Sequence, residues 1–288
     1  MPLTRSRTLG TLKIHAIEAG LQMLDGGAMF GVVPKTLWER RIAPDEKNRI
    51  PLSMRTLLVE HDRGLVLIDT GSGNKESEKF ESIYGIENRS ALGDTHLEDG
   101  IRALGFTPDD VTLVIDTHLH FDHAGGNTRR NEEGITVPSF PKARYVINSG
   151  ELEYAQRANE RTSASYFAHN YMPLVEAGLV DFTQGDREVV PGIELVMAPG
   201  HTPNHQGVLI RSGGETAFFP ADLIPTAAHL PLPWIMGYDV EPLVTLESKR
   251  RLVARATDEE WLVVFEHDAV NCWGRVVAEG KSAVFQAV

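Results

Sequence analysis

Four potential metal ligands lie within six consecutive positions, and this cluster restricts the fold more than any other feature of the chain. His118, His120, Asp122 and His123 directly follow Val111–Asp116, an apolar run typical of a buried strand. Side chains two positions apart in an extended segment share a face, so the first two histidines should point the same way. The adjacent aspartate and histidine point apart and could serve a second ion. A histidine-rich surface turn is the alternative, but this spacing after a strand favours a metal site.

The other residues of this stretch suit a rigid loop. Leu119 and Phe121 alternate with the ligands, so we expect them to anchor the reverse face in the core. Gly125 and Gly126 leave room for another backbone segment to approach closely. The stretch as a whole therefore predicts ligands that are held from behind.

Two ions need more ligands than one loop supplies. Three later strand candidates each end on a ligand-type side chain, where a rigid sheet can aim a residue from a loop. These residues are His201, Asp222 and His267. Each is a weak signal alone, but together they complete a two-ion site.

The pattern of apolar runs favours the α+β class. Strands are expected at Leu12–Ala19, Thr56–His61, Leu65–Asp69, Val111–Asp116, Ala143–Asn148, Ile193–Ala198, Gly207–Arg211, Thr216–Pro220, Trp261–Glu266 and Arg275–Ala278. Helices are expected at Leu97–Leu104, Glu151–Asn159 and Pro242–Ala256. This order predicts two mixed β-sheets packed face to face with helices on the outer faces, an αββα sandwich, in a single domain spanning residues 1–288.

Residues 26–48 differ from the rest, because glycine and proline are mixed with large apolar side chains. We expect a long ordered loop that acts as a lid or as a contact in a homodimer. Met29, Phe30, Val32 and Trp38 could line an apolar slot for an acyl chain, although packing is the commoner role of such residues.

Charge and composition exclude several classes of partner. The net charge of −12 disfavours nucleic acid and anionic membrane surfaces. The chain has no apolar run near the ~20 residues that cross a bilayer, and its first residues do not resemble a secretory signal, so a cytoplasmic location is expected. Its single cysteine, Cys272, is expected to be a buried apolar residue. Two divalent cations would still draw a neutral or anionic small molecule to the site.

These residues resemble the metallo-β-lactamase superfamily of hydrolases, and within it the quorum-quenching N-acyl-homoserine lactonases of the YtnP-type branch. Residues 118–123 match the HxHxDH motif in full. Leu67–Gly71 matches the aspartate-containing turn of the superfamily, and Asp25–Lys35 matches a segment that borders the pocket in the lactonase branch. The resemblance runs from about residue 10 to the end of the chain.

The resemblance implies a ligand assignment and a reaction. His118, His120 and His201 would hold one ion, Asp122, His123 and His267 the other, and Asp222 would bridge both. A hydroxide activated by the two cations would open the lactone ring of an N-acyl-homoserine lactone, with Asp122 as the catalytic proton shuttle. Asp69 and His205 are expected to orient ligand histidines from behind.

The donor set suits zinc, and also manganese, cobalt or iron, because it lacks a thiolate. No organic cofactor is expected, since the motif has histidine rather than glutamate at position 120 and there is no flavin domain. One departure concerns the tyrosine that better-studied lactonases carry three residues after the bridging aspartate. Pro225 stands there, and His229 or Tyr238 could replace the tyrosine.

Other functions remain open on the same residues. Hydrolysis of a phosphotriester or an aryl ester is the main alternative, because related enzymes with this core catalyse it. A thioesterase of the glyoxalase II type is disfavoured, since no basic C-terminal region is present. A nuclease is disfavoured by the acidic balance. A metal-binding protein without turnover is the non-enzymatic alternative.

Overall fold

The computed structural model describes residues 2–89, 95–280 and 282–288. The chain forms two compact units. Unit 1 comprises Met1–Leu21 and Met54–Gln184, and unit 2 comprises Gln22–Ser53 and Gly185–Val288. The boundaries at residues 21 and 53 fall inside two long strands, β2 (Leu12–Asp25) and β3 (Arg49–His61), so the backbone passes between the units without a linker.

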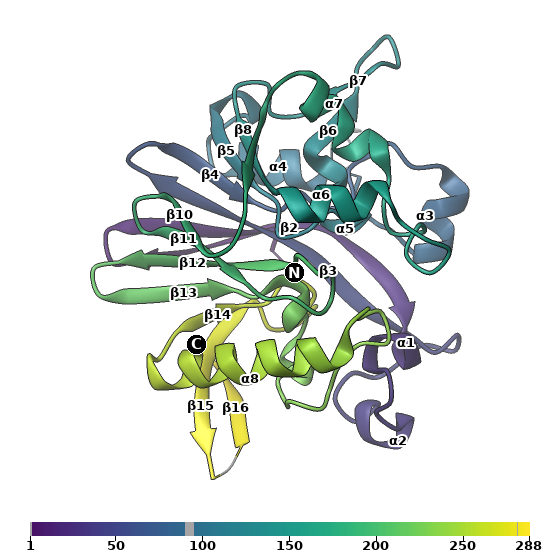
Figure 1. Cartoon of the computed structure of the whole chain (residues 1–288), viewed down its shortest axis with the longest axis vertical. Coiled ribbons are helices and arrows are strands. Elements are labelled where there is room, and N and C mark those ends of the chain that lie inside the picture. Colours follow the sequence, from purple (N-terminus) through teal and green to yellow (C-terminus); the bar gives the residue numbers. More distant parts are fainter. Residues whose placement is uncertain (1, 90–94, 281) are drawn as a thin grey trace. The chain divides into compact units, whose positions relative to one another are not determined.

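Unit 1 contains most of a seven-stranded sheet with the order β1-β2-β3-β4-β5-β8-β9 (Figure 1). Its remaining strands are β1 (Thr4–Leu9), β4 (Gly64–Ile68), β5 (Val111–Ile115), β8 (Arg144–Asn148) and β9 (Val180–Thr183). The pairs β1/β2 and β3/β4 are antiparallel, whereas β4, β5, β8 and β9 pair in parallel, so the sheet is mixed. A tight turn at Asp62 and Arg63 joins β3 to β4.

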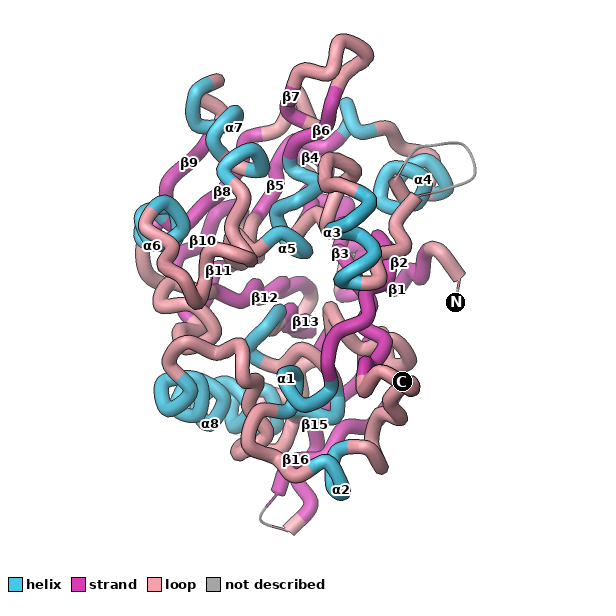
Figure 2. The backbone as a smooth tube through the Cα atoms, turned by 90° about the vertical axis from the view of Figure 1, so that its right-hand side faces the viewer, coloured by secondary structure: helices cyan, strands magenta, loops and turns pink. Residues whose placement is uncertain are grey.

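Helices and short elements complete unit 1. They are α3 (Glu78–Tyr84), α4 (His96–Ala103), α5 (Phe121–Ala124), α6 (Ser149–Gln156), α7 (Met172–Glu176), η1 (Pro108–Asp110), η2 (Gly125–Asn127), η3 (Ala168–Asn170) and the β6 (Thr128–Arg130)–β7 (Thr136–Pro138) hairpin, which projects at the top of Figure 2. Thr95 and Glu98 form a capping box at the start of α4. Leu97 and Ile101 of this helix pack with Ile17 and Leu58 in the core of the unit.

Unit 2 contains a second mixed seven-stranded sheet with the order β10-β11-β12-β13-β14-β15-β16. Its strands are β10 (Arg187–Val190), β11 (Ile193–Met197), β12 (Gln206–Ser212), β13 (Glu215–Phe219), β14 (Leu262–Val264), β15 (Trp273–Glu279) and β16 (Ser282–Ala287). All pairs are antiparallel except β13/β14. The helices are α1 (Gly26–Phe30), α2 (Lys35–Trp38), α8 (Pro242–Asp258), η4 (Ala221–Leu223) and η5 (Ala227–His229).

Helix α8 provides the core of unit 2 with its apolar face. Pro242 occupies the first helical position, which suits its fixed backbone angle and missing N–H. Leu252, Val253 and Ala256 then pack with strand residues that include Phe218 in one buried cluster. The helix lies along this sheet in Figure 1. Because α8 and β13 share this core, the loops at their ends are anchored on the same packed cluster.

Residues 26–48 are more structured than the expected loop. The side chain of Asp25 accepts the Ala28 N–H and begins α1, and α2 follows after Pro34. Met29, Phe30 and Trp38 are buried in one cluster with Met236 instead of lining an open slot. Val32 is 93 % exposed. The glycines thus permit tight helical turns here, and the apolar side chains serve mainly as packing.

The structure contains each element that the sequence analysis named, with boundaries that differ by a few residues. All ten expected strands and all three expected helices are present in the described part of the chain. β2 and β3 are longer than expected, and β14 is shorter, ending at Val264 before the segment that carries His267. No helix among the described residues is long and apolar enough to cross a membrane.

Candidate metal centre

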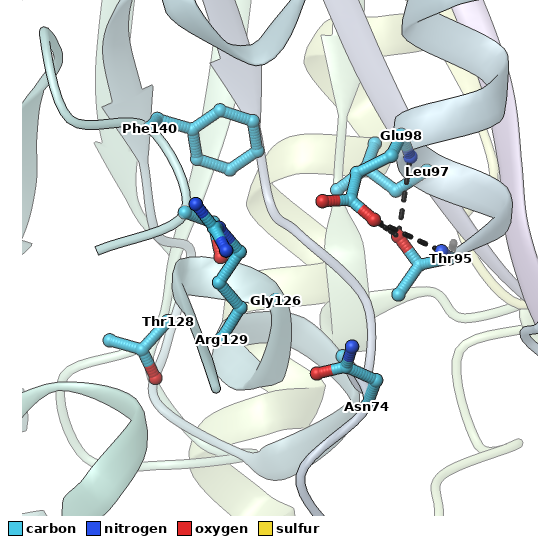
Figure 3. A pocket seen from close by; sticks show the side chains of 10 residues that line it. Asn74, Thr95, Leu97, Glu98, Gly126, Thr128, Arg129 and Phe140 are labelled. Atoms are coloured by element: carbon cyan, nitrogen blue, oxygen red, sulfur yellow. Dashed lines mark hydrogen bonds between the residues drawn. The ribbon is translucent and has the colours of Figure 1, made fainter. Parts of the chain in front are cut away.

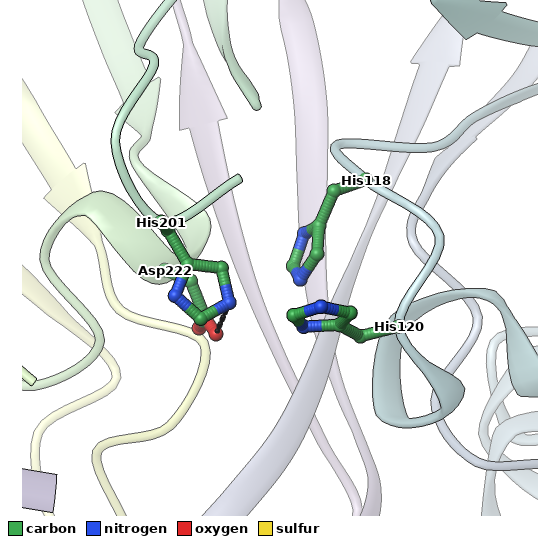
Figure 4. A group of neighbouring side chains, drawn as sticks. All are labelled: His118, His120, His201 and Asp222. Carbon is green, nitrogen blue, oxygen red and sulfur yellow. Dashed lines mark ion pairs between the residues drawn. The ribbon is translucent and has the colours of Figure 1, made fainter. Parts of the chain in front are cut away.

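In unit 1, the end of β5 and the start of α5 position the histidine cluster. The rings of His118 and His120 are 4.5 Å apart, and those of His118 and His123 are 4.0 Å apart. The ligand atoms of the first pair lie within 4.8 Å of each other, as do those of Asp122 and His123. Figure 4 shows His118 and His120 with their rings close together. The structure therefore brings all four predicted ligands of this unit together.

Asp69 supports the cluster from behind. Its carboxylate accepts a hydrogen bond from His123 Nδ1 at 3.0 Å, and others from the Thr117 N–H at 2.8 Å and the Thr117 hydroxyl at 2.7 Å. Because that hydroxyl proton is used, Thr117 Oγ1 accepts from His118 Nδ1 at 3.1 Å. The Nδ1 atoms of both rings are thus held in these hydrogen bonds, and Asp69 orients His123 from behind as expected. Asp69 adopts a positive φ of 54°, a strained conformation common at functional sites.

The two adjacent glycines of the cluster permit close backbone contact, as expected. A Cβ at Gly126 would lie 2.2 Å from the Thr70 carbonyl oxygen, and one at Gly125 would lie 2.4 Å from that of Ser72. The Thr70 N–H donates to the His123 carbonyl at 2.6 Å. The segment 118–127, called the ligand loop below, is therefore held in close contact with the turn that follows Asp69. Leu119 and Phe121 are buried, which confirms their anchoring role.

In unit 2, one carboxylate faces two histidines. Asp222, which lies in η4 after β13, places Oδ2 3.0 Å from His201 Nε2 and Oδ1 2.9 Å from His267 Nε2. All three side chains are buried. Figure 4 shows the contact of His201 with Asp222 as a dashed line. The structure brings together the three predicted ligands of this unit, with a different carboxylate oxygen toward each ring.

The outer nitrogens of these two rings are also held. His201 Nδ1 donates to Asp239 Oδ1 at 2.9 Å, and His267 Nδ1 donates to the Ser53 carbonyl at 2.6 Å. The sequence analysis missed Asp239, because it lies in a loop 38 residues after its partner with no motif around it. Both contacts present Nε2 of the ring toward Asp222.

His205 has a different role from the one expected. Its Nδ1 contacts the Ala198 carbonyl at 3.0 Å, and its Nε2 accepts the Asp222 N–H at 3.2 Å. The prediction that it orients a ligand histidine is wrong, because the tight turn after β11 brings its ring against the backbone of Asp222. It therefore fixes the carboxylate that faces both histidines.

Two neighbouring carboxylates raise the pKa of the His201 ring. Burial lowers the pKa of this ring, but the neighbouring Asp222 and Asp239 carboxylates raise it more strongly, to about 10. The metal-free ring therefore holds a proton at neutral pH, and a bound cation would displace that proton. Buried imidazole and carboxylate donors without a thiolate fit a divalent transition metal such as zinc, manganese, cobalt or iron.

The replacement for the missing tyrosine is not His229. The carbonyl of Pro225 accepts the His267 N–H at 3.0 Å, so this position is used for backbone support. His229 is buried, and its two ring nitrogens contact Thr226 Oγ1 and the Met29 carbonyl, each at 2.8 Å. Tyr238, which is 40 % exposed, remains a candidate. Cys272 is buried, as expected.

Two cavities differ sharply in size. The cavity of unit 1 in Figure 3, between Asn74, Thr95, Arg129 and Phe140, has a volume of about 10 Å³, enough for one water molecule. A groove in unit 2 has a volume of about 530 Å³, within the range of small-molecule sites. Its mainly apolar walls include two segments that follow Asp222 and His267, namely Ala227, Ala228, Leu230 and Pro231, and residues 268–271. Unit 2 thus offers room for a small apolar group near these segments.

Comparison with known proteins places this arrangement in a family. Residues 53–267 match the model of the metallo-beta-lactamase superfamily. An N-acyl homoserine lactonase of Bacillus cereus is 29% identical over 266 residues, covering 89% of this chain and 93% of the relative.

Solved structures of similar proteins support the same family assignment. A probable metal-dependent hydrolase from Staphylococcus aureus has a TM-score of 0.89 at 29% identity, with 98% of this chain and 99% of that chain covered. An N-acyl homoserine lactone hydrolase, solved with the product N-hexanoyl-L-homoserine at its catalytic metal centre, has a TM-score of 0.68 at 25% identity, with 91% and 95% covered. The expected α+β fold is confirmed, and the chain belongs to the metallo-beta-lactamase superfamily of hydrolases.

Proposed function

We propose that this hydrolase opens the lactone ring of N-acyl-homoserine lactones. The relative from Bacillus cereus carries that activity in its name, and a solved relative holds the ring-opened product at its metal centre. The family match supports the hydrolytic chemistry. The lactone substrate is our inference from the relatives, from the donor set and from the apolar groove.

We further propose that seven side chains hold two divalent cations, most simply zinc. His118, His120 and His201 would bind the first, Asp122, His123 and His267 the second, and Asp222 both. The arrangement around Asp222 carries this proposal, because its two oxygens face His201 and His267 separately. A carboxylate set between two histidines in this way suits a bridge between two ions.

The bound cations would supply a water of lowered pKa and would stabilise negative charge on the substrate carbonyl. The protein's own side chains would orient the ligand rings and supply a proton. Asp69 and Asp239 hold the rings of His123 and His201 through Nδ1, which would leave each Nε2 to bind its cation. Asp122 would hold the proton that the leaving alkoxide takes up, since its carboxylate is close to His123 yet not fully buried.

The substrate is expected to be neutral and partly apolar. The chain carries a net charge of −12, which would oppose a strongly anionic macromolecule. The groove of unit 2 is lined mostly by aliphatic residues and Phe285, with Arg41 and Asp268 as its charged members. An acyl chain fits such a lining better than a sugar or a phosphate does.

Hydrolysis of a phosphotriester or an aryl ester at the same site is the second candidate. The observation that favours it is Pro225, because this position cannot supply the phenol that the better-studied lactonases carry three residues after the bridging aspartate. A phosphotriester is neutral, so the acidic surface does not oppose it. The metal ligands and their supports would be unchanged.

Residues 26–48 remain proposed as a lid or a homodimer contact within a single functional domain. Their surface supports such a role, since Val32 is 93 % exposed and Leu37 48 % exposed, while the neighbouring Met29 and Phe30 are buried. Exposed apolar side chains on an otherwise packed segment favour contact with a substrate or a second copy.

A single assay tests the function. Zinc-loaded protein is mixed with C4- and C10-homoserine lactones and with a phosphotriester, and proton release is followed in weak buffer. We expect rapid lactone opening and weak phosphotriester turnover. The reverse preference would establish the second candidate, and turnover of neither would refute both. The Asp222→Asn variant controls for metal-independent hydrolysis.

A further inference from the structure

Lys249 is a fully buried lysine in the middle of α8. Its ammonium group donates to three backbone carbonyls, those of His229 at 2.6 Å, Pro231 at 2.9 Å and Trp234 at 2.8 Å. No carboxylate in the described part of the chain forms an ion pair with it. All three acceptors belong to the segment 225–241, which connects η4 to α8. One side chain therefore fixes several points of this segment.

Burying an ammonium group without a carboxylate partner carries a large desolvation free energy. Burial lowers the pKa of Lys249 to about 7, and the negative charge of Asp239 opposes that shift. An apolar residue of the same length would avoid the desolvation cost, so this lysine is not explained by packing alone. The three carbonyls would lose their donor if the amine were absent.

The segment held by Lys249 leads to the carboxylate that orients a predicted metal ligand. Asp239 lies five residues after Trp234, and its Oδ1 accepts from His201 Nδ1 at 2.9 Å. The Val240 N–H also donates to the His201 carbonyl at 3.3 Å, and the Gly237 N–H donates to the Ala28 carbonyl at 2.8 Å. The far end of the segment is thus placed against His201 by contacts that depend on its path.

We propose that Lys249 is a positioning residue for the metal centre. It holds the segment 225–241 in the conformation that sets Asp239 against His201, and through that carboxylate it fixes the ring for its cation. This inference rests on the proposed two-metal function, and it adds a residue on α8 that contacts neither metal nor substrate. Loss of a supporting contact of this kind typically weakens metal affinity 10- to 100-fold.

The test measures zinc affinity rather than turnover. Lys249→Met keeps the aliphatic stem and removes the three donors, and Asp239→Asn removes the carboxylate. Competition with a fluorescent chelator gives the affinity of each variant and of the double variant. We expect each single change to weaken the tighter zinc site at least tenfold. The double variant should be no weaker than the weaker single variant, because both changes break one chain of contacts.

Two controls separate positioning from general loss of stability. Arg250→Met alters the next, exposed residue of α8, and Ile101→Ala opens a cavity in the core of unit 1. Both should bind zinc as the wild type does at a temperature where all variants are folded.

Three results are decisive. Wild-type zinc affinity in folded Lys249→Met would overturn the inference alone, as would losses that multiply in the double variant. A wild-type chain that takes up no zinc would overturn the proposed function, and this inference with it. Equal weakening in Ile101→Ala would show that the effect is only one of stability, which also refutes the positioning role.

Discussion

The imidazole of His229 is neutral because of the two groups it contacts. The Met29 carbonyl can only accept a hydrogen bond, so Nε2 carries the proton, and Nδ1 accepts from the Thr226 hydroxyl. The ring of Phe30 stacks on it at 4.4 Å with an interplanar angle of 1°. A second proton on Nδ1 would face a hydroxyl and apolar atoms in a dry interior. His229 is therefore a structural tie between α1 and the segment 225–241.

This burial predicts a specific response to acid. Burial lowers the pKa of His229 from its ordinary value of 6.5 to about 3. Between these two values the unfolded chain binds a proton that the folded chain does not. The His229 contribution to stability therefore falls as the pH falls from about 6.5 toward 3, by at most about 1.4 kcal/mol per pH unit.

The measurement is urea unfolding of metal-free protein at pH 7 and pH 4.5, for the wild type and for His229→Phe. The variant should be less stable at pH 7, because the Met29 carbonyl loses its donor, but it should lose less stability on acidification. Equal losses in both proteins would mean that the ring is already protonated in the folded state.

Sequence reasoning at the scale of single residues identified ligand types but not most of their supports. The histidines at 118, 120 and 123 can be recognised as candidate metal ligands because three imidazoles are close together in the chain. Asp69 was predicted through its place in a recognised turn. Asp239 and Lys249 act across 38 and 15 to 20 residues, in segments with no motif, so only the folded chain reveals them.

At the scale of elements, the sequence predicted ten of the sixteen described strands, those whose apolar runs are short and end abruptly. Predicting which residue follows each strand end also located the three ligand candidates of unit 2. The two short helices at residues 26–48 were missed, since α1 depends on the Asp25 cap and on burial of Phe30 against Trp38 and His229. Helices of four or five residues have too little periodicity to be recognised.

The contact between the ligand loop and the turn after Asp69 gives a prediction at this scale. Gly126→Ala would place a methyl group 2.2 Å from the Thr70 carbonyl oxygen, so one of the two backbones must move. We expect a loss of about 1–3 kcal/mol in the free energy of unfolding, the usual cost of overpacking. Because the Thr70 N–H binds the His123 carbonyl, zinc content should fall as well.

Urea unfolding and metal analysis of purified protein check both effects. Gly105→Ala is the control, since its methyl group would meet no atom within 4 Å, although its backbone has a positive φ of 89°. It should lower stability through backbone strain and leave zinc content unchanged. Full zinc content in a destabilised Gly126→Ala variant would show that the contact with the turn does not position the proposed metal ligands.

The chain folds into two units, and the backbone passes from one unit to the other three times. No change of composition marks the crossings at residues 21 and 53, because they lie within β2 and β3. The aromatic residues are unevenly divided between the units. The tryptophans, Trp38, Trp234, Trp261 and Trp273, all belong to unit 2. Tryptophan fluorescence therefore follows side chains of unit 2 in an unfolding experiment.

This division allows the proposed ligand set to be tested on the whole chain. The set takes four ligands from unit 1 and three from unit 2, so bound zinc should stabilise both units together. Free zinc at 1,000 times its Kd adds about 4 kcal/mol, which corresponds to a shift in Tm on the order of 10 °C. Removing zinc with a chelator should lower the midpoint seen by tryptophan fluorescence and also the hydrogen-exchange protection of β5 and β8. Asp222→Ala, which lacks the carboxylate that we propose bridges the two cations, should respond less to the chelator in both measurements. A change confined to one unit would show that the ligands of the other do not bind the same ions.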